Sequence, residues 1–277
     1  YDLMGPGIEA SGGSAANTMA GVASFGGTAS YIGKVSADLL GEVFGHDMRA
    51  VGVNFEVPSS TSGPATARCL ILVTPDAQRT MSTYLGISSL LEPSDVSEAT
   101  VASGKLLFCE GYLWDVDSAK QAIRRAMDIA RSSRRQSALT LSDTFCVERH
   151  HREFRDLVAD SVDVLFANEA ELKALYEVDL EAGVVAVGNE VELACVTLGE
   201  RGSLLVRGGA VTEIAAEPVE HVVDTTGAGD QYAAGVLYGL ANGLDLAECG
   251  RLGSVAAAEV ISHVGPRPLR PLSAFLT

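Results

Sequence analysis

Residues 224–230 hold the side chains of this chain with the clearest capacity for chemistry. Asp224 and Asp230 enclose a turn of small residues in the order Asp-Thr-Thr-Gly-Ala-Gly-Asp, and a run of small and apolar residues follows as far as Leu240. The run predicts a buried helix, so the turn would present unpartnered N–H groups at the positive end of a helix dipole. Such a turn binds anions. Asp230 at its edge could take the proton of a hydroxyl that attacks a phosphate; an ordinary capped turn is the alternative.

A second glycine-containing segment lies near the N-terminus. Gly12 and Gly13 are followed, after three residues, by Asn17. Paired glycines let a ligand approach the backbone closely, and the Asn amide can donate to and accept from sugar hydroxyls. Glycines that serve only tight packing are the alternative.

Polar residues follow one predicted strand at 162–166. Asn168 and Glu171 come directly after it. Carboxylate and amide oxygens suit Mg²⁺, usually through its waters. The same two residues would also form a capping box at the start of a helix, and both roles can coexist.

A glycine turn follows the next predicted strand, at 193–197. Thr197, Gly199 and Gly202 belong to it. Such a turn could contact a ligand, but a β-hairpin at this place would need the same glycines.

Apolar strands alternate with amphipathic helices along the middle of the chain. This alternation indicates a parallel sheet with helices on both faces, and ligands of such sheets bind at the carboxyl ends of the strands. The predicted strands are 105–109, 138–141, 162–166 and 193–197, and the predicted helices are 118–131, 149–158 and 169–176. Outside this region we expect strands at 28–33, 68–74 and 80–85, a hairpin at 203–214, and helices at 18–25, from the glycine turn to Ala241, and at 246–260.

Several charged residues are predicted to have no part in chemistry. Asp38 is expected to cap a helix, and Lys34 to be a solvated charge. The adjacent His150 and His151 are expected on a helix surface, where no partner cluster would complete a metal site.

The composition excludes several classes of partner. The chain has 277 residues, is 47% hydrophobic and carries a formal net charge of −16, with a pI near 4.6. Such a protein is a poor partner for nucleic acid or an anionic membrane, and its apolar runs are too short to span a bilayer. Five widely spaced cysteines indicate a reducing cytoplasm and no structural zinc site.

The segments with candidate chemistry occur in the order found in a known family. Residues 224–230 resemble the C-terminal signature of the PfkB family of ribokinase-like carbohydrate kinases, and residues 12–17 resemble its G-G-x-x-x-N motif. Residues 168–171 and 197–202 resemble its N-x-x-E and T-x-G-x-x-G motifs. The resemblance extends over about residues 12–268.

The resemblance implies a ribokinase-like α/β fold. A mostly parallel central sheet would carry helices on both faces, with a small β-sheet lid. We expect one domain over residues 1–277, with lid strands drawn from a missing N-terminal segment and from about 53–88. The family's first strand carries an acidic residue that grips the substrate hydroxyls. No such strand precedes Gly12, and Asp2 is in the wrong context to replace it, so we expect that segment to be absent from these residues.

The resemblance also implies a role for each matching residue. Asp230 would be the catalytic base. The anion hole would consist of Gly227, Ala228 and Gly229; the substrate would contact Gly12, Gly13 and Asn17; and ATP would contact Asn168, Glu171, Thr197, Gly199 and Gly202. Glu171 would hold Mg²⁺ through water, and Asp224 and Thr226 match positions near a site for a monovalent cation such as K⁺. His263 would border the adenine of ATP; a solvated His at a helix end is the alternative.

The implied activity is transfer of the γ-phosphoryl group of ATP to a primary hydroxyl. Ser142 and Phe145 resemble the Ser-x-x-Phe of the adenosine-kinase branch, whose ring stacks on the substrate base, and residues 265–268 (G-P-R-P) resemble the end of that branch. Phe145 as a core residue is the alternative. The predicted substrate is therefore a nucleoside, most of all adenosine, bound by a cytoplasmic monomer or homodimer.

Three other functions stay open at this point. A sugar kinase of the ribokinase or fructokinase type would share all the motifs of the phosphate site. A nucleotide- or sugar-binding regulator would keep the fold without the chemistry, although the intact Asp230 argues against it. A dehydrogenase is a weaker alternative, because no G-x-G-x-x-G follows the first strand.

Overall fold

A six-stranded sheet forms the centre of the structure. The computed structural model describes residues 6–56 and 59–276, so Asp2 and residues 57–58 of the expected lid region lie outside the described residues. The strands are β5 (Leu106–Glu110), β6 (Gln136–Thr140), β7 (Val164–Asn168), β8 (Leu193–Thr197), β9 (Ser203–Arg207) and β10 (Ala210–Ile214). Their order is β10-β9-β8-β7-β6-β5. The strands from β5 to β8 are parallel, and β9 and β10 continue the sheet antiparallel, so the sheet is mostly parallel as predicted.

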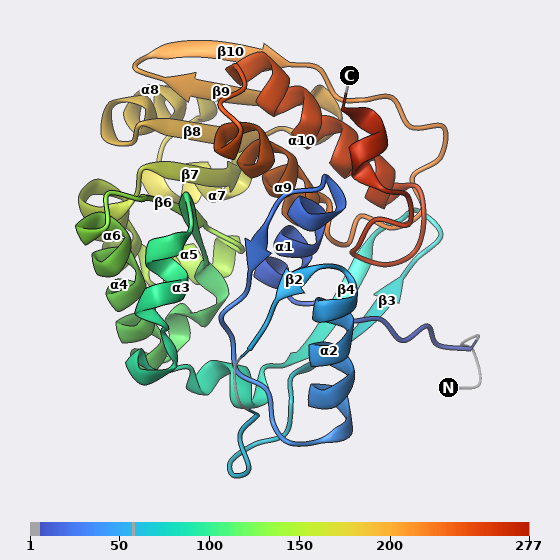
Figure 1. Ribbon diagram of the computed structural model, residues 1–277. Coiled ribbons are helices and arrows are strands. Elements are labelled where there is room, and N and C mark those ends of the chain that lie inside the picture. The colour runs from blue at the N-terminus through green and yellow to red at the C-terminus, as the bar shows by residue number, and fades with distance from the viewer. Residues whose placement is uncertain (1–5, 57–58, 277) are drawn as a thin grey trace.

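Helices cover both faces of this sheet (Figure 1). The first layer contains α4 (Asp117–Ser132), α5 (Thr144–Arg149), α6 (His151–Ser161), α7 (Glu169–Tyr176) and α8 (Leu180–Glu190). The second layer contains α1 (Ser14–Ser24), α9 (Ala228–Ala241) and α10 (Leu246–Ile261). Short helices connect these parts: α3 (Glu98–Ser103), η1 (Gly86–Leu90), η2 (Pro93–Asp95), η3 (Gly111–Asp115), η4 (Gly199–Arg201) and η5 (Leu272–Phe275).

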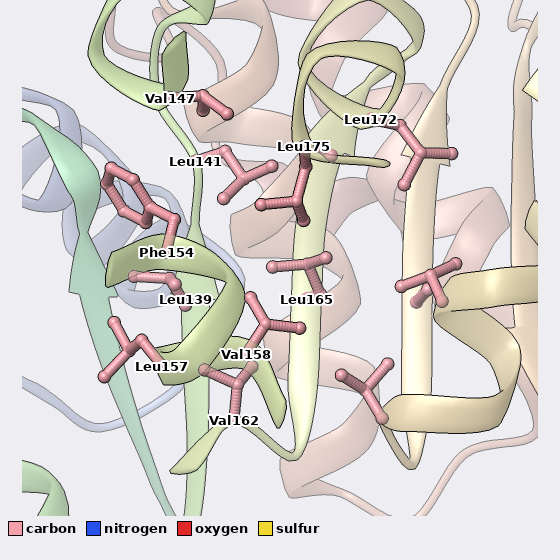
Figure 2. Close-up of a cluster of buried hydrophobic side chains, with 14 of the residues drawn as sticks. Leu139, Leu141, Val147, Phe154, Leu157, Val158, Val162, Leu165, Leu172 and Leu175 are labelled. Carbon is pink, nitrogen blue, oxygen red and sulfur yellow. The ribbon is translucent and has the colours of Figure 1, made fainter. Parts of the chain in front are cut away.

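Strand β7 contributes side chains to two apolar clusters, one on each face of the sheet. All of its residues before Asn168 are buried. Leu165 belongs to the cluster that α4, α6, α7 and α8 cover, whereas Phe166 belongs to the cluster that α1 and α9 cover. Figure 2 shows the first cluster, in which side chains from the strands meet those of α6 and α7. A strand buried on both faces must be apolar throughout, which is why these strands are continuous apolar runs.

The register of the strands brings their carboxyl ends to one edge. Asn168 at the end of β7 pairs with Thr197 at the end of β8. Glu110 at the end of β5 pairs with Thr140 at the end of β6. Polar side chains that follow these strands therefore share the edge where such sheets bind ligands.

Glycine lets α9 and α10 approach closely. A Cβ atom at Gly235 would lie 2.4 Å from the carbonyl oxygen of Leu252, and one at Gly253 would lie 2.9 Å from the ring of Tyr232. Larger side chains would push the helices apart. This contact fixes α9, and with it the turn at residues 224–230.

A pair of strands forms a small sheet of its own. Strands β3 (Arg68–Val73) and β4 (Arg79–Tyr84) pair antiparallel, as predicted, apart from the central sheet (Figure 1). Nearly all of their side chains are exposed on both faces. A two-stranded sheet with so little burial has little stability of its own, so its contacts with the rest of the chain matter.

The N-terminal third contains the remaining elements. Strand β1 (Ala29–Ser30) pairs in parallel with β2 (Val53–Asn54) and is shorter than the predicted strand 28–33. Helix α2 (Leu39–Ala50) begins after Asp38, whose Oδ1 accepts a hydrogen bond from the amide of Gly41. The predicted capping role of Asp38 is therefore confirmed.

Several local predictions were wrong. Lys34 is not a solvated charge, because its Nζ lies 2.9 Å from Asp95 Oδ2 and its side chain is only 15% exposed. The predicted helix 149–158 is interrupted at His150, whose ring packs against Asp115 at 2.7 Å rather than lying free on the surface. Helix α8 was missed because its sequence is rich in Val and Gly, which favour no helix on their own. No helix within residues 6–56 and 59–276 has the length and apolar character to cross a membrane.

Candidate active site

The amino end of α9 lies where the sequence placed an anion-binding turn. Gly227 precedes the helix with a φ of 81°, a conformation that side chains rarely adopt. A Cβ there would also lie 2.6 Å from the carbonyl oxygen of Pro266. Both facts require glycine at this position. By contrast, a Cβ at Gly229 would meet no atom within 4 Å, so this side of the turn is open to a ligand.

The first amides of α9 are available to an anion. The Ala228 amide donates to the carbonyl oxygen of Thr225 at 3.3 Å, and the Gln231 amide donates to that of Gly227. Among the described residues, none accepts a hydrogen bond from the amides of Gly229 or Asp230. Free amides at a helix start, with the dipole behind them, form a site for phosphate.

Two residues of α1 hold the Asp230 carboxylate. Ser14 Oγ donates to Oδ1 at 2.8 Å, and Asn17 Nδ2 donates to Oδ2 at 2.9 Å. Burial raises the pKa of Asp230 above its ordinary value, although these hydrogen bonds and the nearby Arg79 act in the opposite direction. The predicted motifs at 12–17 and 224–230 therefore meet, and Asn17 contacts the candidate base directly.

The orientation of Asn17 depends on a loop near the C-terminus. Arg267 Nε donates to Asn17 Oδ1 at 3.3 Å, which leaves the Asn17 amide group to face Asp230. Gln231 Nε2 donates to the carbonyl oxygens of Asn17 and Pro266, both at 3.0 Å. The G-P-R-P segment therefore stabilises the contact between α1 and α9 through hydrogen bonds of Pro266 and Arg267.

Sequence reasoning missed Arg79. This residue begins β4 in the small sheet, and its Nη1 donates to Thr225 Oγ1 at 2.5 Å. Its charge lowers the pKa of both Asp224 and Asp230. The small sheet therefore carries a cation to the anion turn. No sequence pattern distinguishes a lone arginine after a Pro-Asp turn. Only the pairing of β3 with β4, and the position of this hairpin beside Thr225, bring Arg79 to the anion turn.

Sequence reasoning also missed Glu110, the last residue of β5. Its Oε2 accepts a hydrogen bond from the amide of Ala15 at 2.8 Å, in the first turn of α1. Burial raises its pKa to about 7; the Ala15 hydrogen bond opposes this and the charge of Asp230 adds to it. A single glutamate at the end of a strand gives no signal in the sequence. The rule that ligands bind at the carboxyl ends of parallel strands could have pointed to it.

Asn168 and Glu171 form the capping box that the sequence allowed. The Asn168 side chain accepts from the Glu171 amide, and the Glu171 carboxylate accepts from the Asn168 backbone and side-chain amides at 2.9 and 2.7 Å. Burial raises the pKa of Glu171 to about 7, opposed by the Asn168 amide and assisted by Asp143. Because both carboxylate oxygens already accept hydrogen bonds, the pair suits a Mg²⁺ held through water better than one bound directly.

The turn at 197–202 is a tight hairpin connection. Gly202 has a φ of 86°, and a Cβ there would lie 2.0 Å from the carbonyl oxygen of Ile214. Gly199 also has a positive φ and open space around it. Thr197 lies beside Asn168 in the sheet. The hairpin alternative is therefore correct for Gly202, and the turn still lies on the edge where parallel sheets bind ligands.

Asp224 and Thr226 stabilise the turn itself. Asp224 Oδ1 accepts from the Thr226 amide and hydroxyl at 2.9 and 2.6 Å, and Oδ2 accepts from the Gly265 amide at 3.1 Å. Burial alone would raise the pKa of Asp224, but the hydrogen bonds from Thr226 and Gly265 and the charge of Arg79 lower it.

Four other predicted site residues lie at or near helix ends. Phe145, near the start of α5, is 74% exposed, so the alternative that it belongs to the core is wrong. His263 is not a solvated side chain, because its Nε2 lies 3.3 Å from Oε2 of the buried Glu259 and its side chain is 15% exposed. Gly13, with a φ of 97°, precedes α1, and a Cβ at its neighbour Gly12 would meet no atom within 4 Å.

The chain matches a family model along almost its whole length. Residues 9–272 match the pfkB family carbohydrate kinase. An uncharacterized sugar kinase of Archaeoglobus fulgidus is 26% identical over 91% of this chain and 99% of its own length. The 5-dehydro-2-deoxygluconokinase of Listeria monocytogenes is 27% identical over 91% of this chain and 80% of its own.

Solved structures resemble the whole of the fold. The adenosine kinase from Sinorhizobium meliloti is 50% identical, with a TM-score of 0.97 over 100% of this chain and 85% of that one. A probable sugar kinase protein from Rhizobium etli is 46% identical, with a TM-score of 0.96 over 99% of this chain and 84% of that one. The fold is ribokinase-like, and these comparisons favour a kinase over a binding regulator or a dehydrogenase. This chain belongs to the pfkB family of carbohydrate kinases.

Proposed function

We propose that this kinase transfers the γ-phosphoryl group of ATP to a primary hydroxyl of a nucleoside, adenosine above all, with Asp230 as the general base. One observation carries the chemical part of the proposal. The Asp230 carboxylate is held by Ser14 and Asn17 beside the amides of Gly229 and Asp230, which donate to no acceptor among the described residues. A base next to an anion site is what in-line phosphoryl transfer requires.

Asp230 would accept the proton of the attacking hydroxyl. The hydrogen bonds from Ser14 and Asn17 favour the ionised form of the carboxylate and fix its position. The amides of Gly229 and Asp230 would meet the negative charge on the phosphoryl oxygens, and Arg79 would supply a full positive charge from the small sheet. Gly227 and Ala228 would shape this anion hole.

The nucleotide would lie along the edge formed by β7 and β8. In this proposal Asn168, Glu171, Thr197, Gly199 and Gly202 border its phosphates, and His263 borders its adenine. A Mg²⁺ ion would neutralise phosphate charge, and Glu171 would hold it through water. Asp224 and Thr226 would adjoin a monovalent cation; their mutual hydrogen bonds stabilise the turn with or without it.

Two observations support a nucleoside as the acceptor. Phe145 exposes a large aromatic surface near the start of α5, just beyond the carboxyl end of β6, where a flat apolar base could stack. The structure from Sinorhizobium meliloti, 50% identical over the whole chain, is that of an adenosine kinase. Gly12, Gly13 and Asn17 would contact the sugar portion.

A sugar kinase is the second candidate. The Rhizobium etli structure, 46% identical, is described as a sugar kinase, and the curated relatives include 5-dehydro-2-deoxygluconokinases. The phosphate half of the site is the same for both candidates, so only the acceptor distinguishes them.

ADP release measured with a panel of acceptors tests the proposal. Adenosine should give a kcat/KM at least tenfold above ribose, fructose and gluconate, and Phe145→Ala should raise KM for adenosine by about tenfold, because base stacking is worth about 1–3 kcal/mol. Phe145→Tyr, which keeps the ring, is the matched control and should stay close to the wild type. Faster turnover of a free sugar than of any nucleoside would establish the second candidate instead.

A further inference from the structure

The acceptor half of the site contains a carboxylate that the proposed chemistry does not use. Glu110 ends β5 and reaches the first turn of α1, where its Oε2 accepts from the Ala15 amide at 2.8 Å. Its other oxygen, Oε1, accepts no hydrogen bond from the described residues, and it is not fully enclosed. An ionisable group with one satisfied and one open oxygen is able to bind a donor on a ligand.

Glu110 lies within electrostatic reach of the candidate base. The charge of Asp230 contributes to the raised pKa of Glu110. Both carboxylates contact the same short segment of α1, through Ser14 and Asn17 on one side and Ala15 on the other. Any acceptor that places its hydroxyl at Asp230 therefore lies close to Glu110.

The two halves of the site differ in charge. Arg79 and the free amides of α9 adjoin the position proposed for the phosphates. On the acceptor side, burial raises the pKa of Tyr112, and the charges of Asp143, Asp230 and Glu110 add to this rise, as does that of Glu171 from the nucleotide side. An anionic group on the acceptor would meet uncompensated negative charge there, at a cost that burial increases.

Arg267 is a cation on this side of the site, and its guanidinium group is already engaged. Its Nε donates to Asn17 Oδ1, its Nη2 lies 3.4 Å from Met48 Sδ, and Asp47 is the carboxylate that favours its charged form. Arg267 therefore does not offset the charge of Glu110.

We propose that Glu110 determines the charge class of the acceptor: it binds a hydroxyl or amine donor through Oε1 and excludes acceptors that carry a carboxylate or phosphate. This inference rests on the proposed function, because it takes Asp230 as the place where the acceptor hydroxyl binds. Glu110 is a specificity-determining residue here, with no part in bond making or breaking.

Three titratable groups around Glu110 stay uncharged near neutrality. They are Tyr31, beyond β1, and Tyr112 in η3, whose pKa values are raised, and the neighbouring Cys109, whose pKa burial raises to about 12. Burial raises the pKa of Asp230 as well, and that of Glu171 to about 7. The comparison of the wild type with Glu110→Gln therefore decides whether a change in acceptor selectivity near pH 7 belongs to Glu110.

Glu110→Gln separates charge from shape. Glutamine keeps an oxygen for the Ala15 amide and removes the negative charge. The matched control is Glu181→Gln, on the exposed first turn of α8. Glucosamine, glucose and gluconate form a series of cationic, neutral and anionic acceptors that each carry a primary hydroxyl. Each compound is used as a competitive inhibitor of the acceptor that the enzyme turns over fastest. The three inhibition constants then measure how tightly the site binds a cationic, a neutral and an anionic acceptor.

In the wild type, inhibition should weaken from glucosamine to glucose to gluconate. Glu110→Gln should lower the ratio of the gluconate to the glucose inhibition constant by about tenfold, the order expected for one charge near contact in a partly solvated site. That ratio should rise with pH through about 7 in the wild type, as Glu110 ionises, and stay level in Glu110→Gln. Glu181→Gln should behave as the wild type in both respects.

Three results would overturn the inference. The first is a change of less than twofold in the gluconate-to-glucose ratio, including no inhibition by gluconate in either protein. The second is an equal change in Glu181→Gln. The third is a fall in kcat of more than about 10²-fold in Glu110→Gln at saturating concentrations of the preferred neutral acceptor, which would place Glu110 in the chemistry. Failure of the proposed function is a separate result, because it would appear as retained turnover in an Asp230 variant.

Discussion

The charge of Asp230 depends on two side chains of α1. Burial favours the neutral acid, while the hydrogen bonds from Ser14 and Asn17 favour the carboxylate. A base must be ionised to accept a proton, so activity should fall as the pH drops through the pKa of Asp230. Because that pKa is raised, the loss should begin at a higher pH than for an ordinary aspartate.

Ser14→Ala should shift the fall in activity at low pH, the acid limb of the pH profile, to still higher pH. The substitution removes a hydrogen bond that favours the ionised carboxylate, and a bond to a charged group is worth about 1.5 kcal/mol or more, which corresponds to about one pH unit. The pH dependence of kcat/KM measures the shift. Ser11→Ala is the control, since the Ser11 hydroxyl donates to Asp47 and not to Asp230. An unmoved limb in Ser14→Ala would mean that Asp230 is not the titrating base.

At the scale of elements, the β3–β4 hairpin is tied to the site by few contacts. Arg79 donates to Thr225 Oγ1, and the Thr225 hydroxyl also lies 3.4 Å from the carbonyl oxygen of Ala77 in the turn. Most other side chains of the two strands are exposed. Segments with so little burial open at low free-energy cost, so the hairpin is suited to admit and cover a substrate.

Arg79→Ala should lower kcat by about 10²–10³-fold, the range for loss of one group that stabilises transition-state charge. The melting temperature should change little, because the side chain is exposed. Arg79→Lys should recover part of kcat, as it keeps the charge without the fork geometry. Arg68→Ala, at the other end of the hairpin, is the control and should keep wild-type kcat. A loss of kcat in Arg68→Ala equal to that in Arg79→Ala would show a general effect of the hairpin.

The sequence predicted well those helices and strands whose ends are marked by residues close by in the chain. Helix α7 and strand β8 have the predicted bounds, because a capping box and a continuous apolar run mark them. Helix α5 was missed, and the predicted helix 149–158 runs across the break before α6, since that break at His150 depends on contacts with Asp115, far away in the chain. Arg79 and Glu110 could not be predicted for the same reason: each acquires its role from a partner far away in sequence.

At the scale of the whole molecule, the candidate site is assembled from segments that only the completed fold brings together. Ser14 and Asp230 are separated by 216 residues, and Arg79 and Thr225 by 146. The apolar cluster on one face of the sheet contains side chains of both α1 and α9 and holds the two helices against each other. The sequence motifs identified the residues of α1 and α9, but only this packing shows that their side chains touch.

The overall charge of −16 hides a local asymmetry that the sequence alone could not reveal. Arg79 and the start of α9 meet in the phosphate half, whereas the charges of Asp143, Asp230 and Glu110 act on Tyr112 in the acceptor half. A polyanionic donor and an uncharged acceptor would each find a matching surface, which agrees with a kinase for nucleosides or neutral sugars.

Asp230→Asn tests the central claim most directly. Asparagine keeps the size of the side chain and an oxygen acceptor, but it cannot take up a proton. The account predicts that kcat for ADP release with the best acceptor falls by about 10²–10⁴-fold, the range for loss of a general base, while the dissociation constants of ATP and acceptor, measured by calorimetry, change by less than about tenfold. A kcat within tenfold of the wild type would contradict the account.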